Sequence, residues 1–230
     1  MPHKPEHIFL DLDHTIWDFE TNSDRAYKKL LAEENIHVPF EKFIEIYHPV
    51  NQKVWEAYAA GVYTKEQVKI IRLKTVFDRL GYAFPPGEIL RMAERYLDFL
   101  AEGTALFPGA LETLSYLAEK YPLHLITNGF VEVQYRKIEN SGLKKFFDTV
   151  TVSEETGALK PHPGVFKHAL KKAGTVAHKS LMVGDSVRSD VLGARNVGMQ
   201  AVLFDPKNRE QLPETVAPTI RCLTELQTML

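Results

Sequence analysis

The distribution of apolar and polar residues along the chain predicts short buried strands separated by amphipathic helices. The apolar segment 8–10 stops abruptly at Asp11, as expected of a buried strand whose carboxyl end opens into a polar loop. Similar segments follow at 123–127, 150–153, 180–184 and 201–204. Because helical patterns lie between these segments, the chain favours βαβ units and a parallel sheet.

The helices between the later strands are marked by apolar faces and by glycines at their expected ends. Apolar residues recur at helical spacing in the segments 111–118 and 165–173. Gly142, Gly174 and Gly198 each stand where a helix should stop, since glycine tolerates the left-handed backbone conformation that ends many helices. These glycines predict where the helices of the α/β core end.

Residues 17–103 break the alternation of strands and helices. They hold amphipathic helical stretches, such as 89–100, and no strand pattern. We therefore predict a helical insert of roughly 85 residues, which is an ordinary size for a small domain. The remaining residues, 1–16 and 104–230, are predicted to form the α/β core.

Composition and charge narrow the class of protein. Hydrophobic residues make up 44% of the 230 and charged residues 25%, which is typical of a globular chain. The formal net charge of -2 offers nothing that would recruit a nucleic acid polymer or an anionic membrane. The single cysteine, Cys222, excludes an internal disulfide, and the polar start of the chain is unlike a signal peptide. We therefore expect a cytoplasmic protein that binds neither a nucleic acid polymer nor a membrane. The sequence leaves its oligomeric state open.

Polar residues of kinds that take part in catalysis or ligand binding follow four of the predicted strands. In open α/β sheets, ligands bind outside the carboxyl ends of the strands. In chain order these residues are Asp11 and Asp13, then Thr127, Asn128 and Gly129, then Lys160, and finally Gly184, Asp185 and Asp190. Taken singly, each is common in an ordinary turn or on a surface. Their shared position at strand ends is what predicts a common site.

The carboxylates of this set favour a hard divalent cation. Asp11 and Asp13 are two residues apart on an extended segment and can point the same way, and Asp185 adds a third acid. Such oxygen ligands suit Mg²⁺, which usually binds one or two carboxylates together with substrate phosphate.

The other members of the set favour a phosphate ligand. Lys160 supplies a positive charge suited to phosphate or to an aspartate nucleophile. Thr127 offers a hydroxyl, and the backbone N–H groups of Asn128 and Gly129 offer further donors for phosphate oxygens. Together with the cation, these groups predict a site for phosphoryl transfer.

These residues resemble the four motifs of the haloacid dehalogenase-like (HAD) superfamily of hydrolases. The segment 8–15 is similar to the first motif, and Thr127, Lys160 and Asp185 with Asp190 are similar to the other three. The resemblance implies a Rossmann-like parallel sheet core with helices on both faces and an inserted all-helical C1-type cap. A closer similarity is to the noncanonical pyrimidine 5′-nucleotidase branch, whose members act on pyrimidine nucleoside monophosphates. It is carried by Asn51 with residues 55–61, by residues 126–130, and by residues 152–157 with 160–161.

The resemblance also implies a role for each acid. Asp11 would attack phosphorus to form an aspartyl-phosphate, and Asp13 would protonate the leaving alkoxide and then take a proton from the hydrolytic water. Mg²⁺ would be held by Asp11, the backbone carbonyl of Asp13 and Asp185, with Asp190 supporting the metal or its waters.

The remaining roles concern the phosphoryl group. Thr127 and the amides of Asn128 and Gly129 would hold its oxygens, and Lys160 would fix the nucleophile and offset the phosphate charge. The expected partner is therefore a small-molecule phosphate ester.

Three alternatives remain beside a nucleotidase. The first is a phosphatase of small metabolites, of the phosphoglycolate or sugar-phosphate kind, and the second is a non-catalytic phospholigand-binding protein. The third is a haloacid dehalogenase, which Asp13 disfavours because a halide leaving group needs no proton.

Further residues are interpreted as structural. His14 is expected to be a loop side chain covering the site, and the alternative is a substrate contact. Tyr47, Trp55 and Tyr58 could stack on a nucleobase, but at helical spacing they are expected to form the core of the insert. Hinges for closure of the insert are predicted at 16–20 and 101–107.

Overall fold

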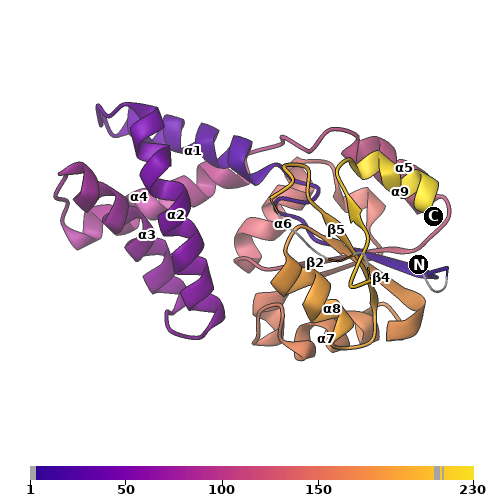
Figure 1. Cartoon of the computed structure of the whole chain (residues 1–230). Coiled ribbons are helices and arrows are strands. Elements are labelled where there is room, and N and C mark those ends of the chain that lie inside the picture. The colour runs from indigo at the N-terminus through magenta and orange to yellow at the C-terminus, as the bar shows by residue number, and fades with distance from the viewer. Residues whose placement is uncertain (1–3, 210–212, 214) are drawn as a thin grey trace. The chain divides into compact units, whose positions relative to one another are not determined.

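The chain folds into two compact units. A computed structural model describes residues 4–209, 213 and 215–230. One unit, the α/β core, comprises the chain up to Glu20 and from Thr104 onward, and the other, the helical unit, comprises Thr21–Gly103 (Figure 1).

The α/β core is built on a parallel sheet. Within the described residues the sheet has six strands in the order β3-β2-β1-β4-β5-β6, and each neighbouring pair is parallel. The strands are β1 (His7–Leu10), β2 (Leu123–Thr127), β3 (Thr149–Val152), β4 (Ser180–Gly184), β5 (Gln200–Phe204) and β6 (Thr219–Ile220). Five of them were predicted from the apolar segments. The two-residue β6 was not, because so short a strand leaves no pattern.

The register of the central strands fixes where the site can lie. Leu10, at the end of β1, is aligned with Leu125 of β2 and with Val183 of β4. The amide of Asp11 continues this pairing by donating to the carbonyl of Val183 at 2.9 Å. The polar residues that follow β1, β2 and β4 therefore emerge at one edge of the sheet.

Helices cover both faces of the sheet, as predicted. Helices α7 and α8 lie on one side, and α5 and α9 lie on the other (Figure 1). The core helices are α5 (Ala110–Ala118), α6 (Val131–Asn140), α7 (Pro163–Lys172), α8 (Gly193–Arg195) and α9 (Leu226–Met229). Short 3₁₀ turns are η1 (Lys144–Phe146), η2 (Ser153–Thr156), η3 (Ala177–Lys179) and η5 (Leu223–Glu225), and η4 (Val187–Leu192) is π-helical.

Apolar packing and glycine helix ends agree with the sequence pattern. Phe9, Ile126 and Met182, from three adjacent strands, pack in one buried cluster with Phe166 of α7 and Ala194 of α8. The predicted helix-ending glycines all have positive φ: Gly142 at 65°, Gly174 at 67° and Gly198 at 88°.

The helical unit is held together by an aromatic core. Its helices are α1 (Phe19–Glu33), α2 (Phe40–Ala59), α3 (Lys65–Leu80) and α4 (Pro86–Ala101). Tyr27 and Tyr96 stack with ring centroids 3.9 Å apart, and Tyr47 is fully buried against both. Trp55 and Tyr58 pack edge to face on α2 and stay partly exposed. The expected core role thus fits Tyr47, whereas the other two retain accessible surface.

Two linkers join the units, and they are hydrogen-bonded to one another. The amide of Asp18 donates to the carbonyl of Ala105 at 3.0 Å, and that of Phe107 donates to Ile16 at 2.9 Å. Buried Trp17 pairs with Leu106 as an isolated bridge. The first segment of the compact core unit runs to Glu20, whereas the sequence pattern predicts that the core segment ends at residue 16. Among the described residues, we find no helix with the length and apolar character needed to cross a bilayer.

We expect His124 to make stability depend on pH. Its ring is 2% exposed within β2, with Nε2 3.0 Å from His7 Nδ1 and Nδ1 2.9 Å from the hydroxyl of Thr149. Burial, reinforced by His7, lowers the pKa of His124 from 6.5 to about 4. Only the unfolded imidazole takes up a proton between these values. Stability that is complete above pH 6.5 is therefore lost as the pH falls toward 4.

Urea unfolding of the parent and the His124→Asn variant at several pH values tests this dependence. The parent should lose more unfolding free energy than the variant between pH 6.5 and 4. Parallel profiles in the two proteins would show that His124 is not the group responsible.

Candidate active site

Lys160 is the centre of a buried ionic cluster at the carboxyl edge of the sheet. Its ammonium nitrogen lies 2.5 Å from Asp11 Oδ1, 2.7 Å from Asp190 Oδ1 and 2.8 Å from the carbonyl oxygen of Ile126. The side chain is 1% exposed, so it is not the solvated surface lysine that its sequence context alone suggests. The structure thus brings together residues from the first, third and fourth predicted motifs.

Electrostatics keep Lys160 charged. Burial alone would lower the pKa of Lys160, but the carboxylates of Asp11 and Asp190 outweigh it and hold that pKa above its ordinary value. A buried ammonium with three hydrogen-bond partners is a fixed positive charge beside Asp11. Since Lys160 occupies only one oxygen of Asp11, the other oxygen is available for chemistry.

The carboxylates of the site form a group that fits a divalent cation. Asp11, Asp185 and Asp190 each offer an oxygen, and these atoms lie within 4.8 Å of one another. Burial raises the pKa of Asp11 to about 7, against the opposing effect of Lys160, and burial with the charge of Asp11 raises the pKa of Asp185. Three acids beside one ammonium leave an excess of negative charge. An ion such as Mg²⁺ matches both that excess and the oxygen donors.

Asp190 is bound on both of its oxygens by the protein. Oδ1 accepts from Lys160, and Oδ2 accepts from the backbone amide of Ser186 at 3.0 Å. Within the described residues, Asp185 has no such ion pair. This difference favours Asp185 as the direct metal ligand and Asp190 as a supporting acid, as predicted from the sequence, although the metal roles stay predictions.

Gly184 makes the approach of Asp190 possible. A Cβ atom at Gly184 would lie 2.4 Å from Asp190 Oδ2. The Gly184→Ala substitution should therefore displace the Asp190 carboxylate, lower unfolding free energy by about 1–3 kcal/mol and reduce kcat by up to roughly 100-fold. Thermal unfolding and a phosphatase assay measure the two effects.

Gly87 offers a matched control for that substitution. A Cβ at Gly87, in the first turn of α4, meets no atom within 4 Å. Gly87→Ala should gain about 0.4–1 kcal/mol and leave kcat unchanged. A Gly184→Ala protein as stable and as active as Gly87→Ala would contradict the steric argument.

Asn128 clamps the loop that carries Lys160. Its side-chain oxygen accepts from the backbone amide of Lys160 at 2.9 Å and from the hydroxyl of Ser153 at 2.6 Å. Its side-chain nitrogen donates to the carbonyl of Lys160 at 3.1 Å. The sequence predicted only the backbone of Asn128 as a phosphate donor, and that role stays a prediction. The side-chain role was missed because it depends on how two distant loops meet.

Asp13 is held by two side chains of α6. Lys137 Nζ lies 2.8 and 3.1 Å from its two carboxylate oxygens, and Gln134 Nε2 lies 2.8 Å from Oδ2. Neither residue was singled out from the sequence. The available signal was their spacing of three, which puts two polar residues on the face of α6 that also holds buried Val133 and Ile138.

Thr127 and Gly129 lie beside the same glutamine. Thr127 is fully buried, and its hydroxyl oxygen is 2.7 Å from Gln134 Nε2. A Cβ at Gly129 would come within 2.5 Å of that nitrogen, so the glycine makes room for the glutamine. Thr127 therefore ends β2 close to Asp13, while phosphate binding by Thr127 and Gly129 stays a prediction.

His14 adopts a backbone conformation that suits glycine. Its φ is 65°, in the left-handed region, and its ring lies 4.9 Å from that of Phe19. Burial lowers the pKa of His14. The packing agrees with the interpretation of His14 as a loop side chain covering the site.

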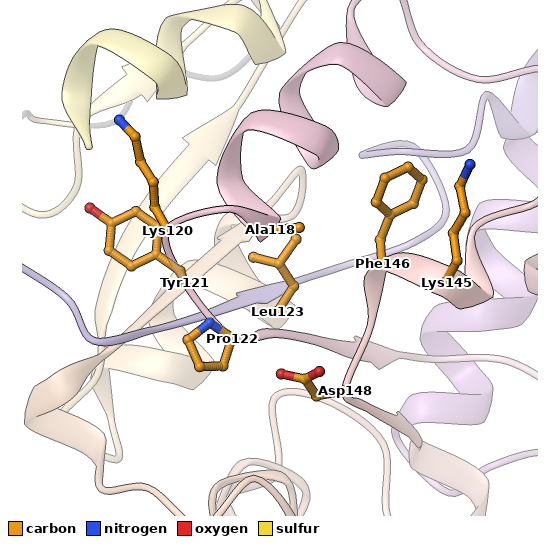
Figure 2. A pocket seen from close by; sticks show the side chains of 8 residues that line it. All are labelled: Ala118, Lys120, Tyr121, Pro122, Leu123, Lys145, Phe146 and Asp148. Carbon is orange, nitrogen blue, oxygen red and sulfur yellow. The ribbon is translucent and has the colours of Figure 1, made fainter.

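The pocket in Figure 2 lies elsewhere on the core. Its wall includes Leu123, the first residue of β2, whereas Thr127 is the last residue of the same strand. The pocket has a volume of about 410 Å³ and is lined by Ala118, Lys120, Tyr121, Pro122, Leu123, Lys145, Phe146 and Asp148. Because Leu123 begins β2 and Asp148 directly precedes β3, the pocket lies at the amino edge of the sheet, opposite the ionic cluster.

Comparison with known proteins agrees with this geometry. The chain is 33% identical to the pyrimidine 5′-nucleotidase YjjG of Escherichia coli over 226 residues, which cover 97% of this chain and 96% of that protein. It is 44% identical over 198 residues to a glyceraldehyde 3-phosphate phosphatase of Pyrococcus furiosus, covering 86% of this chain and 79% of the relative. The crystal structure of the HAD-hydrolase YfnB from Bacillus subtilis, bound to magnesium, matches with a TM-score of 0.89 at 29% identity, covering 99% of both chains.

The family assignment follows from these matches. The model of the haloacid dehalogenase-like hydrolases matches residues 5–198, a range that begins before β1, contains the whole helical unit and runs beyond β4. The resemblance drawn from the four motifs and the predicted fold are both confirmed. This chain belongs to the haloacid dehalogenase-like hydrolase family.

Proposed function

We propose that the protein is a Mg²⁺-dependent phosphomonoester hydrolase that works through an aspartyl-phosphate on Asp11. The observation that carries the proposal is the pairing of two acids with two different lysines. Asp11 is bound to Lys160 within the cluster of carboxylates that would hold Mg²⁺, whereas Asp13 is bound to Lys137 outside it. Two nearby carboxylates in different environments suit the separate tasks of nucleophile and acid–base catalyst.

In the first step, the free oxygen of Asp11 attacks phosphorus while the bond to the leaving alkoxide breaks. Lys160 holds the other oxygen of Asp11 and keeps the nucleophile in place. Asp13 gives its proton to the leaving oxygen, and the hydroxyl of Thr127 donates to a phosphoryl oxygen. Asp11, Asp185 and the backbone carbonyl of Asp13 would hold Mg²⁺, which when bound neutralises charge on the carboxylates and on the phosphoryl group.

In the second step, Asp13 takes a proton from water as that water attacks the phosphorus of the aspartyl-phosphate. The bond between phosphorus and Asp11 breaks, and inorganic phosphate leaves. Asp13 thereby returns to its starting protonation state. A dehalogenase needs no acid at this position and a binding protein needs neither acid, so the intact pair favours the phosphatase over both alternatives.

We propose pyrimidine nucleoside monophosphates as the substrate class. Support comes from the likeness to the E. coli nucleotidase, which includes the helical unit, and from the partly exposed Trp55–Tyr58 pair, whose rings offer a surface for a nucleobase. The helical unit would act as the cap that sets this selectivity, with hinges at 16–20 and 101–107. The likeness to the P. furiosus enzyme keeps a sugar-phosphate phosphatase as the second candidate.

A panel of phosphate esters with and without Mg²⁺ tests the proposal. Pyrimidine 5′-monophosphates should show higher kcat/KM than purine 5′-monophosphates, glyceraldehyde 3-phosphate or phosphoglycolate, and chelation of the metal should abolish phosphate release. Faster turnover of triose phosphates would favour the second candidate and contradict the nucleotidase proposal. Absence of phosphate release from every ester would contradict the phosphatase itself.

The setting of this activity is also a proposal. We propose that the protein acts on a small phosphate ester in the cytoplasm. The near-neutral net charge agrees with a small-molecule partner, and the single cysteine agrees with a reducing compartment.

A further inference from the structure

Among the described residues, the side chains that bind the Asp13 carboxylate both come from α6. Lys137 Nζ reaches both of its oxygens, at 2.8 and 3.1 Å, and Gln134 Nε2 reaches Oδ2 at 2.8 Å. Lys137 is 2% exposed and Gln134 is 1% exposed. A buried lysine and a buried amide are costly unless they are paired, so these contacts are a built arrangement and not incidental surface neighbours.

The position of Lys137 is fixed independently of Asp13. Its ammonium nitrogen lies 4.2 Å from the ring centroid of buried Trp17, and Trp17 Nε1 donates to the hydroxyl of Ser141 at 3.1 Å. Lys137 lies within α6 and Ser141 caps the carboxyl end of that helix. Because they are four residues apart, they lie on the same side of it. The ring and the helix therefore hold the ammonium where Asp13 meets it.

The orientation of the Gln134 amide follows from its neighbours. The carboxylate of Asp13 and the carbonyl of Asn128, at 3.2 Å, are both acceptors, so the atom that faces them must be the nitrogen. The two hydrogens of this nitrogen serve the two nearer acceptors, Asp13 Oδ2 at 2.8 Å and the hydroxyl oxygen of Thr127 at 2.7 Å. Thr127 then keeps its own hydrogen for a further acceptor. Within the part of the chain that the structure describes, the buried Gln134 Oε1 has no hydrogen-bond partner, so the contacts of the nitrogen orient the amide.

We propose that Lys137 and Gln134 are positioning residues that hold Asp13 for proton transfer to the leaving oxygen, and that Gln134 also directs the Thr127 hydroxyl toward the phosphoryl group. The inference rests on the proposed phosphatase function. As the bond between phosphorus and the leaving oxygen breaks, the proton of Asp13 moves to that oxygen. Lys137 and Gln134 bind the carboxylate that remains.

The test uses the need of the leaving group for a proton. An alkyl phosphate, such as a nucleoside 5′-monophosphate, leaves as a strongly basic alkoxide, whereas p-nitrophenyl phosphate leaves as a stable phenolate. The second-order constant kcat/KM covers only the steps up to alcohol release, so it isolates this proton transfer. The variants are Lys137→Met, Lys137→Arg and Asp13→Asn, with Lys171→Met on the exposed face of α7 as the control.

Lys137→Met should lower kcat/KM for the alkyl phosphate on the order of 10- to 100-fold more than for p-nitrophenyl phosphate. Lys137→Arg should recover much of the loss, and Lys171→Met should change neither value. In the Asp13→Asn background, adding Lys137→Met should lower kcat/KM for the alkyl phosphate only slightly further, because Lys137 acts through the acid that this background lacks.

Two results would overturn the inference. One is an equal loss for both substrates in a folded Lys137→Met protein, and the other is a full additional loss in the Asp13→Asn background. A different result would identify failure of the proposed function: if Asp13→Asn itself lost the same factor on both substrates, Asp13 would not be the acid. Thermal unfolding of each variant separates these outcomes from misfolding.

Discussion

The Asp11→Asn variant is expected to lose phosphatase activity by roughly 10⁴-fold or more while remaining folded. The amide has the shape of the carboxylate but cannot attack phosphorus. Burial raises the pKa of Asp11 from 3.8 to about 7, so ionising this carboxyl costs more free energy in the folded protein than in the unfolded chain. Without metal, the neutral Asn should therefore leave the melting temperature unchanged or higher. Steady-state phosphate release and thermal unfolding measure the two effects.

The comparison needs a control for traces of parent enzyme. Asp11→Glu provides this control. The longer side chain keeps the acid but moves its reactive oxygen away from Lys160, so any parent-like activity in its preparation measures the traces of parent enzyme. Residual activity in Asp11→Asn above roughly 1% of the parent, well beyond the expected 10⁴-fold loss, would contradict the assignment of Asp11 as nucleophile.

Replacing Lys160 with Met should have the largest effect on stability in the core. The ammonium bonds to Asp11, Asp190 and a backbone carbonyl, and it is 1% exposed. Its removal leaves buried carboxylates without their counter-charge, which costs about 3–5 kcal/mol of unfolding free energy. Activity should also fall, because Asp11 loses the group that holds it. Urea unfolding in metal-free buffer gives the stability change.

Magnesium supplies an internal check on that result. If the carboxylate cluster binds the ion, added Mg²⁺ should restore part of the lost stability in Lys160→Met, since bound cation replaces some of the missing positive charge. Lys171→Met, at an exposed position, should stay within about 0.5 kcal/mol of the parent. A Lys160→Met protein as stable as that control would contradict the view that Lys160 neutralises the cluster.

The strands and the strand-end residues could be predicted because a parallel sheet turns a linear pattern into a spatial one. An apolar run that stops at an acid marks a carboxyl end, and all such ends meet at one edge. Asp11 and Asp185 were found in this way, and Lys160 and Asp190 were assigned to the loops that follow the third and fourth of these strands.

Other parts of the site depend on packing that no local pattern encodes. The spacing of Gln134 and Lys137 puts them on the buried face of α6, but only their contact with Asp13 across the fold shows what they do there. The clamp of Asn128 on Lys160 joins loops far apart in the chain. Trp17 pairs with Leu106, which lies beyond the insert in the chain, and this pairing leaves no local pattern in the sequence around Trp17.

The central claim is that phosphate passes through a covalent bond to Asp11, and trapping that bond tests it most directly. The enzyme is mixed with substrate and Mg²⁺, quenched in acid within the first turnover, digested and mapped by mass spectrometry. The claim predicts one added phosphoryl group on the peptide that contains Asp11, and none in Asp11→Asn. Phosphate release in the same samples with no modified peptide, or with the phosphoryl group on another residue, would contradict it.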